Sequence, residues 1–345
     1  MRKKFHPVFA ASLAAVSVGT ALLVFAGARR PARAEVVSTV PPAEALAAFF
    51  DFSAPADWMS RNAVLLGARK LTQLILPGAH DAASYSLRPD SRACPSRIDV
   101  RASLAAFFMA ARARAQEQPV AAQLAAGVRY LDLRVCALRD KAGKTSYVTH
   151  HTFLGAPLAD VLEDIDAFTR AHPREVLILD FQDLNGFDAG DRAQLQAQLE
   201  RRFGNRMLST AVNPATATMA EVWKRGASLV VVMDAAQPSP HIFDRAAMLD
   251  SRWFNAQSVT ALERLAAVFR PATARLHVLQ WQLTPGALEF ITHPTATLKE
   301  FAKGPNALIV DGTFRKLFAA RQLNVVMTDD VVAVAGAIAR MNALR

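Results

Sequence analysis

The sequence predicts an α/β protein in which parallel strands form one barrel-sized domain. Three features lead to this prediction: the length of the chain, the alternation of short apolar runs with longer helical patterns, and the lack of a linker within residues 50–345. Continuous Val, Ile and Leu runs are typical of parallel strands buried on both faces. A single barrel of about 250–300 residues suits this pattern better than two domains do.

Apolar runs mark the expected strands, and helical patterns lie between several of them. The expected strands are residues 71–76, 128–133, 176–181, 229–233, 276–283 and 324–328. The expected helices are residues 104–116, 157–171, 192–203 and 259–269. Residues 188–191 are expected to form a loop and a helix N-cap, and Pro271 is expected to stop a helix.

The positive charge of the chain is concentrated near its start. The net charge is +10, but residues 1–34 hold six Lys and Arg and no acidic residue, so the remainder carries +10 − 6 = +4. A mildly basic remainder without a basic-aromatic patch argues against a nucleic-acid partner. The hydrophobic content of 52% excludes a wholly disordered chain.

Residues 1–34 have the pattern of an export signal. Arg2, Lys3 and Lys4 precede an apolar run over residues 7–28, and residues 32–34 match a small-x-small cleavage site. We therefore expect a secreted or periplasmic protein, with a linker at residues 35–54 and the barrel at residues 55–345. An uncleaved N-terminal membrane anchor is the alternative, because the apolar run is long and arginines flank it.

The chain has two cysteines, Cys94 and Cys136. Export would permit a disulfide, and Cys136 lies just past the second expected strand, near the loop that carries Cys94. We predict that they pair; two unrelated thiols are the alternative.

Polar residues with catalytic chemistry follow several of the apolar runs. They are His80 and Asp81, Asp132 and Arg134, His150 and His151, and Asp329 and Asp330. The carboxyl ends of the strands of a parallel barrel open onto one face, so these side chains are expected to converge there. Two imidazoles can act as general base and general acid in phosphodiester cleavage, while an arginine binds the phosphate in a bidentate fork. This scheme needs no metal.

Several segments resemble the X domain of phosphatidylinositol-specific phospholipases C. The likeness is carried by residues 77–81, 127–134 and 150–151, continues through residues 172–181, and is weaker in residues 276–285 and 324–329. It covers roughly residues 55–335 and implies a distorted TIM-type (β/α) barrel. The implied reaction is lyase-like: the inositol 2-hydroxyl attacks phosphorus and expels diacylglycerol, leaving a cyclic inositol phosphate.

The resemblance also implies roles for individual residues. His80 would be the general base, held by Asp329, and His151 the general acid, supported by Asp81. Arg134 stands where calcium-dependent members carry an acidic metal ligand, which resembles the secreted bacterial type that needs no cofactor. Adjacent strand residues face opposite ways, so only one of His150 and His151 is expected to be catalytic.

The headgroup region departs from the bacterial pattern. Gln182 and Asp234 stand near positions where that branch carries basic residues. Asp132, Asp180, Gln182 and Asp234 are therefore the candidate substrate-binding residues. Calcium is the alternative to a metal-independent site, because Asp81, Asp132 and Asp180 carry oxygen ligands of the kind that calcium prefers.

The expected partner is a phospholipid at a membrane surface, and the expected state is a monomer. Two other functions compete. One is a phosphodiesterase of the same barrel that acts on a glycerophosphodiester or a sphingolipid. The other is a non-catalytic lipid-headgroup binder, which would have no reason to keep both an acid and a base.

Overall fold

The computed structural model describes residues 49–95 and 109–344, apart from residues 111, 273, 287–288, 290–291, 294–295 and 320. The expected export segment, most of the expected linker and residues 104–108 of the first expected helix lie outside the described residues. Residues 112–113 form a turn and residues 114–116 have no regular secondary structure, in place of the expected helix. The hydroxyl of Ser84 accepts hydrogen bonds from the backbone N–H groups of Ala115 and Gln116, so these groups are bound outside any helix.

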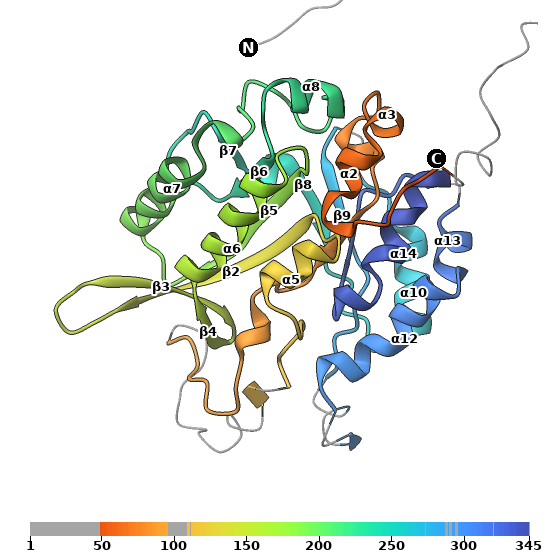
Figure 1. Ribbon diagram of the computed structural model, residues 1–345. Helices are drawn as coiled ribbons and strands as arrows, with labels where there is room; N and C mark the ends of the chain where they lie inside the picture. The colour runs from red at the N-terminus through yellow and green to blue at the C-terminus, as the bar shows by residue number, and fades with distance from the viewer. Residues whose placement is uncertain are drawn as a thin grey trace, which may run out of the picture. The chain divides into compact units, whose positions relative to one another are not determined.

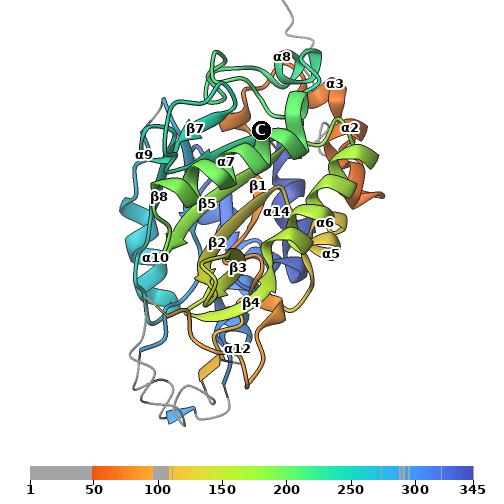
Figure 2. The ribbon, with the colours of Figure 1, turned by 90° about the vertical axis from the view of Figure 1, so that its left-hand side faces the viewer.

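Parallel strands form a curled sheet in the order β7-β6-β5-β2-β1-β10-β9-β8 (Figures 1 and 2). The adjacent pairs in this order are all parallel, as the alternation of strands and helices predicts. The strands β7 and β8 stand at the two ends of the order and leave the barrel open between them. The architecture is a distorted TIM-type barrel. A hairpin of β3 and β4 extends the sheet antiparallel to β2.

The strands are β1 (Leu76–Ala79), β2 (Tyr130–Arg139), β3 (Thr145–His151), β4 (Phe153–Pro157), β5 (Leu177–Asn185), β6 (Leu229–Met233), β7 (Ile242–Asp244), β8 (Leu249–Arg252), β9 (Leu276–Gln280) and β10 (Val325–Thr328). The α-helices are α2 (Trp58–Arg61), α3 (Ala63–Leu66), α5 (Val120–Ala125), α6 (Leu158–Ala171), α7 (Ala189–Phe203), α8 (Met219–Lys224), α9 (Arg245–Met248), α10 (Val259–Val268), α12 (Leu298–Val310), α13 (Thr313–Leu317) and α14 (Ala335–Arg340).

Two groups of helices cover opposite sides of the sheet, and α2, α3 and α8 lie at one end of the barrel (Figure 1). The helices α5, α6 and α7 lie beside β2 and β5, while α10, α12, α13 and α14 lie on the opposite side of the barrel. The helix α7 begins at the expected cap, because the Asp188 carboxylate accepts a hydrogen bond from the Asp191 N–H. No helix in the described ranges has the length and apolar character to span a bilayer.

The first expected strand is displaced along the chain. Residues Leu71–Gln73 form a 3-10 turn, and β1 begins only at Leu76. The side-chain amide of Asn324 donates hydrogen bonds to the carbonyl oxygens of Leu71 and Leu74. These two carbonyls are therefore bound by a side chain and not by the backbone of a neighbouring strand. The apolar run reflects burial, which a 3-10 turn and a strand share.

A buried ion pair joins the start of the described chain to the barrel. Arg129 and Glu175 are both fully buried, and the guanidinium Nη2 lies 2.7 Å from the carboxylate of Glu175. Glu175 also accepts hydrogen bonds from the backbone N–H groups of Met59 and Ser60 in α2. One carboxylate therefore binds α2 to the chain just before β2.

We expect Glu175→Gln to lower the free energy of unfolding by about 3–5 kcal/mol, because it leaves the buried Arg129 charge without a counter-ion. Urea denaturation followed by circular dichroism measures this loss. Glu163→Gln is the matched control, because Glu163 pairs with Arg202 at the surface and exposed pairs contribute little. Equal losses in the two variants would contradict the anchoring role of Glu175.

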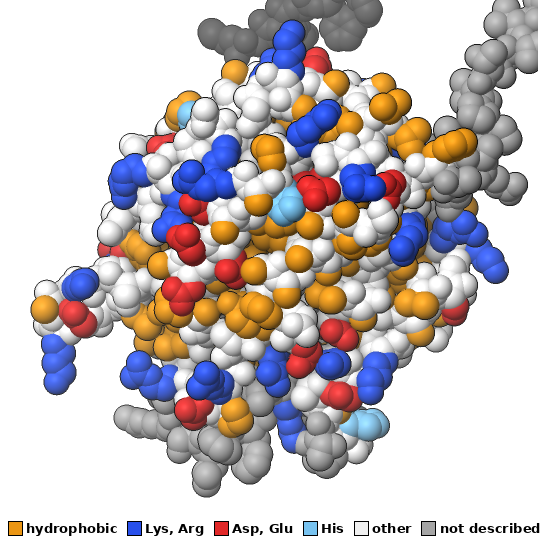
Figure 3. All heavy atoms as spheres, in the orientation of Figure 1, with side chains coloured by type: hydrophobic (Ala, Val, Ile, Leu, Met, Phe, Trp, Pro, Cys, Tyr) orange, Lys and Arg blue, Asp and Glu red, His pale blue; other side chains and the backbone are white. Residues whose placement is uncertain are grey.

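Charges are mixed on the face of the molecule drawn in Figure 3. Lys and Arg side chains alternate there with Asp and Glu instead of gathering in one area. This face carries no continuous basic surface.

Candidate active site

The candidate site lies at the carboxyl ends of the parallel strands, where the inner face of the barrel changes from apolar to polar. Tyr130, Ile178 and Val278 belong to the buried apolar cluster of the interior. Side chains two residues apart share a face of a strand. The next inward residues are therefore Asp132 on β2, Asp180 on β5 and Gln280 on β9, all buried.

His80 and Asp329 form a hydrogen-bonded pair across neighbouring strand ends. The imidazole Nδ1 of His80 lies 2.6 Å from Oδ1 of Asp329, so Nδ1–H donates to the carboxylate. Burial alone would lower the pKa of His80, but the charge of Asp329 outweighs it and the pKa is raised. The sequence-predicted pair is therefore in contact.

His151 is held at Nδ1 by a backbone carbonyl. Its Nδ1–H donates to the Ala113 oxygen at 2.6 Å, and the expected partner Asp81 lies 3.4 Å from the same nitrogen. Burial, together with the positive charge of Arg134, holds the pKa of His151 well below its usual value. The centroids of the His80 and His151 rings are 5.5 Å apart and the rings are nearly perpendicular.

Arg134 lies between the acidic residues of the site. Its Nη2 donates to Asp132 Oδ2 at 2.8 Å and its Nε to Oδ1 at 3.3 Å, while Asp81 Oδ2 is 3.9 Å from Nε. Although burial would raise the pKa of Asp132, Arg134 holds it below its usual value. Asp132 thus fixes the guanidinium that the sequence predicts to bind phosphate.

Asp81 is a buried carboxylate with a raised pKa. Its two oxygens make no hydrogen bond within the described part of the chain. Burial, opposed by Arg134, raises the pKa of Asp81 to about 7. Its backbone has a left-handed φ of 41° and its N–H donates to Asp132, so the turn after β1 is bound to the carboxylate that holds Arg134.

Gln116 joins the two strand ends that carry His80 and Asp329. Its amide nitrogen donates to the carbonyl oxygens of His80 and Thr328, each at 2.9 Å, and its amide oxygen accepts from the Val331 N–H. Nothing in the sequence pattern marks this glutamine, because its role depends on two strand ends 249 residues apart.

Arg245 is a candidate site residue that the sequence pattern did not indicate. It donates to Asp180 from Nε at 2.7 Å and from Nη2 at 3.0 Å, and Tyr130 also donates to Asp180 at 2.7 Å. Asp180 therefore positions Arg245 at the mouth of the barrel. Arg245 follows the three-residue strand β7, which is too short to give a sequence pattern.

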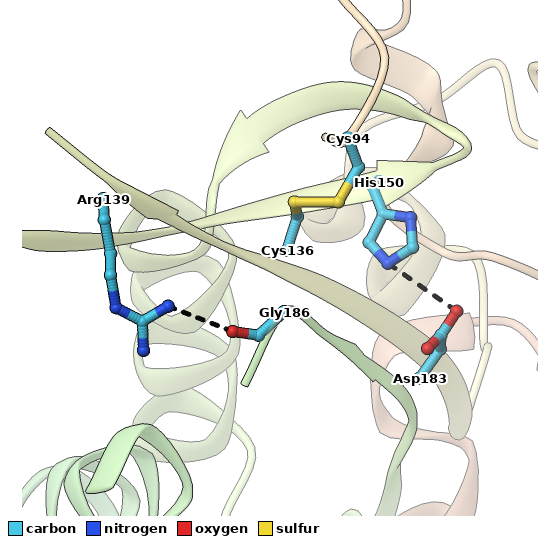
Figure 4. Close-up of a disulfide and its surroundings, with 6 residues drawn as sticks. All are labelled: Cys94, Cys136, Arg139, His150, Asp183 and Gly186. Atoms are coloured by element: carbon cyan, nitrogen blue, oxygen red, sulfur yellow. Dashed lines mark hydrogen bonds and ion pairs between the residues drawn. A yellow bond between two sulfur atoms is a disulfide. The ribbon is translucent and has the colours of Figure 1, made fainter. Parts of the chain in front are cut away.

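The other predicted residues lie in three places. Gln182 lies at the register shift between β2 and β5, 3.4 Å from Nη2 of Arg134. Its side-chain amide nitrogen, turned toward Asp132, donates hydrogen bonds to both carboxylate oxygens of that residue. Asp234 is 74% exposed and pairs with Arg192 of α7, away from this group. His150 is buried on the opposite face from His151, 3.8 Å from Asp183 (Figure 4).

Two glutamines complete the polar interior of the barrel mouth. Gln280 donates to the Ser251 hydroxyl of β8, and Gln282 donates to Gln280. Sequence reasoning left them in a strand, because Gln at a strand end carries no catalytic signal of its own.

Two of the three carboxylates that are candidate calcium ligands are engaged by other side chains. Arg134 binds both oxygens of Asp132, and Arg245 with Tyr130 binds both oxygens of Asp180. The oxygens of the third candidate, Asp81, make no hydrogen bond within the described part of the chain. Among the described residues, no group of three or more His, Cys, Asp and Glu side chains is arranged to hold a metal ion.

Residues 103–226 match the family profile "Phosphatidylinositol-specific phospholipase C, X domain". A variant-surface-glycoprotein phospholipase C of Trypanosoma cruzi is 33% identical over 229 residues, 60% of this chain and 58% of that protein. The human PI-PLC X domain-containing protein 2 is 28% identical over 67% of this chain and 78% of its own length. This chain therefore spans somewhat more than half of the trypanosomal relative.

Solved structures share the fold. The phosphatidylinositol-specific phospholipase C of Listeria monocytogenes superposes with a TM-score of 0.56 at 19% identity, over 83% of this chain and 98% of that one. The corresponding Staphylococcus aureus enzyme gives 0.55 at 16% identity over the same shares. The protein thus has the fold of the phospholipase C-like phosphodiesterases. In sequence and in fold it is related to the phosphatidylinositol-specific phospholipase C X-domain family.

Proposed function

We propose that the protein cleaves the phosphodiester of a phospholipid, with phosphatidylinositol as the preferred substrate, and releases diacylglycerol. The observation that carries this proposal is the pair of imidazoles beside the guanidinium of Arg134. The ring centroids of His80 and His151 are 5.5 Å apart. A headgroup-binding protein would need the guanidinium but not two imidazoles, each held at Nδ1.

The geometry suits in-line transfer between two histidines. Nδ1 of each ring is engaged, by Asp329 in His80 and by Ala113 in His151, which directs Nε2 of each toward substrate. His80 Nε2 accepts the proton of the inositol 2-hydroxyl while that oxygen bonds to phosphorus. The phosphorus–glycerol bond breaks and His151 Nε2–H protonates the departing oxygen. The products are diacylglycerol and a cyclic inositol phosphate.

Substrate binding supplies the charge that this mechanism needs. In the protein alone, burial and Arg134 keep the pKa of His151 low, which favours its neutral form. A phosphodiester anion beside Arg134 neutralises that positive charge and favours the imidazolium. The general acid is therefore charged by the substrate that it protonates.

Arg245 is the proposed headgroup contact. It is partly exposed at the barrel mouth, and Asp180 holds it at two nitrogens. We expect Arg245→Lys to lower kcat/KM about tenfold, mainly through KM, because an ammonium keeps the charge but loses the planar fork. Steady-state kinetics on phosphatidylinositol vesicles measures this change. Arg192→Lys is the matched control, because Arg192 pairs with the exposed carboxylate of Asp234 and lies outside the site. Equal losses of kcat/KM in the two variants would contradict the assignment of Arg245 to the headgroup.

A substrate panel tests the proposed function. Phosphatidylinositol, phosphatidylcholine, sphingomyelin, glycerophosphoinositol and variant surface glycoprotein are incubated with the protein and with a His80→Ala/His151→Ala variant. The proposal expects diacylglycerol from phosphatidylinositol, and the double variant to lose it. Preferred cleavage of sphingomyelin or glycerophosphoinositol would contradict the assignment of phosphatidylinositol as the substrate but not the phosphodiesterase activity. Binding of phosphatidylinositol without turnover of any substrate would overturn the enzymatic function.

A further inference from the structure

The segment Arg92–Cys94 is bound on two sides. Cys94 forms a disulfide with Cys136 of β2, as the sequence predicts, with Cα atoms 6.2 Å apart (Figure 4). On its other side, the Cys94 N–H donates to the Thr152 oxygen at 2.8 Å, and the Leu154 N–H donates to the Arg92 oxygen at 2.7 Å. The segment thus adds a short antiparallel bridge to β4, and the disulfide joins this bridge to β2.

The residue held by this bridge follows the proposed general acid directly. Thr152 has a left-handed φ of 65°, which is unfavourable for a β-branched residue and persists only when its surroundings impose it. The hydrogen bond from Cys94 is one such restraint. The orientation of the backbone at His151 therefore depends on the segment that carries Cys94.

The disulfide also relates this turn to the phosphate-binding side of the site. Cys136 lies two residues after Arg134 on β2 and pairs with Val148 of β3. Ala113, whose carbonyl accepts the Nδ1–H of His151, lies within the 94–136 loop that the disulfide closes. By contrast, the ring of His80 is held by Asp329, which lies outside that loop.

We propose that the Cys94–Cys136 disulfide is a positioning device for His151, which fixes the turn after this histidine against the strand that carries Arg134. The proposal deepens the proposed function and rests on it, because His151 is taken as the acid that protonates the leaving group. Loss of the disulfide should therefore impair leaving-group protonation while substrate binding by Arg134 and Arg245 persists.

Leaving-group dependence distinguishes this role from a purely structural one. A phosphodiester with an alkoxide leaving group needs the acid, whereas one with a 4-nitrophenolate leaving group needs it little. For Cys94→Ala/Cys136→Ala we expect kcat on phosphatidylinositol to fall about 100-fold, and kcat on 4-nitrophenyl inositol phosphate to fall less than about threefold, with little change in KM. His151→Ala gives the reference pattern. Thr152→Gly, which keeps the disulfide but loosens the turn, should give a smaller loss of the same kind even if the double variant does not fold.

A second measurement needs no catalysis. The downfield proton resonance of His151 Nδ1–H, identified by its loss in His151→Ala, should disappear in the double-alanine variant while that of His80 remains. If wild type cleaves no substrate, the proposed function fails, and this resonance still decides the positioning claim. Leu199→Ala of α7 is the control for lost stability, and both substrates and both resonances should be unaffected. Equal loss on the two substrates, unchanged activity, or a persistent His151 resonance would overturn the proposal.

Discussion

Arg134→Ala is expected to lower kcat about 1,000-fold. In the proposed mechanism the guanidinium stabilises the charge that develops on the phosphate oxygens. Removing one such group typically costs about 3–4 kcal/mol of transition-state stabilisation. Arg134→Lys should recover little, because an ammonium cannot reproduce a planar two-pronged contact with phosphate. Turnover of phosphatidylinositol, with circular dichroism to confirm the fold, measures both variants.

Arg139→Lys is the matched control for the lysine variant. Arg139 lies on the same strand, β2, and pairs with Asp188 and Asp191 near the surface. It should leave kcat and KM unchanged. A folded Arg134→Lys variant with wild-type turnover would show that a bidentate contact at this position is not part of the reaction.

Asp329→Asn should move the acidic limb of the pH–rate profile to lower pH and lower the maximal rate about 100-fold or more. His80 must be neutral to accept a proton, so activity rises as pH passes upward through its pKa. Asp329 raises the pKa of His80 against the opposing effect of burial. Without this carboxylate burial dominates, the pKa falls, and the neutral base persists at lower pH. The rate falls because the carboxylate that accepts the Nδ1–H hydrogen bond no longer stabilises the imidazolium that forms. The profile of kcat/KM against pH measures the shift.

Asp330→Asn separates this role from that of the neighbouring carboxylate. Asp330 has a left-handed φ of 46°, which asparagine also tolerates, and its N–H donates to the Ala115 oxygen. This variant should leave the acidic limb in place. A limb that moves with Asp330→Asn but not with Asp329→Asn would transfer the assignment to Asp330.

The sequence predicted the residues at strand ends because one physical rule governs them. Parallel strands end on the same face, so His80 and Asp329, which directly follow β1 and β10, could be assigned to one site although 249 residues separate them. Arg134 was expected just after a strand that ends at residue 133, whereas β2 continues to Arg139 and carries Arg134 within it. The alternation of side chains along a strand indicated that only one of His150 and His151 belongs to the site, and the family resemblance indicated His151. The disulfide followed from two cysteines near adjacent segments.

The remaining parts of the site depend on backbone groups and short elements that leave no pattern. Ala113 binds His151 through its carbonyl oxygen, which every residue possesses. Gln116 acts through three backbone groups of distant segments. Arg245 follows β7, a strand too short for periodicity to show. The shift of β1 from the expected run has the same origin, because burial alone does not distinguish a 3-10 turn from a strand.

Phosphorus NMR of the reaction in EDTA tests the central claim most directly. Protein freed of divalent ions by chelation is incubated with phosphatidylinositol, and the water-soluble products are followed with time. Two histidines with Arg134 as the built-in cation predict undiminished turnover and accumulation of a cyclic inositol phosphate. Loss of activity in EDTA and its return with calcium would contradict this account, and Arg134 would then be only an ion-pair partner of Asp132.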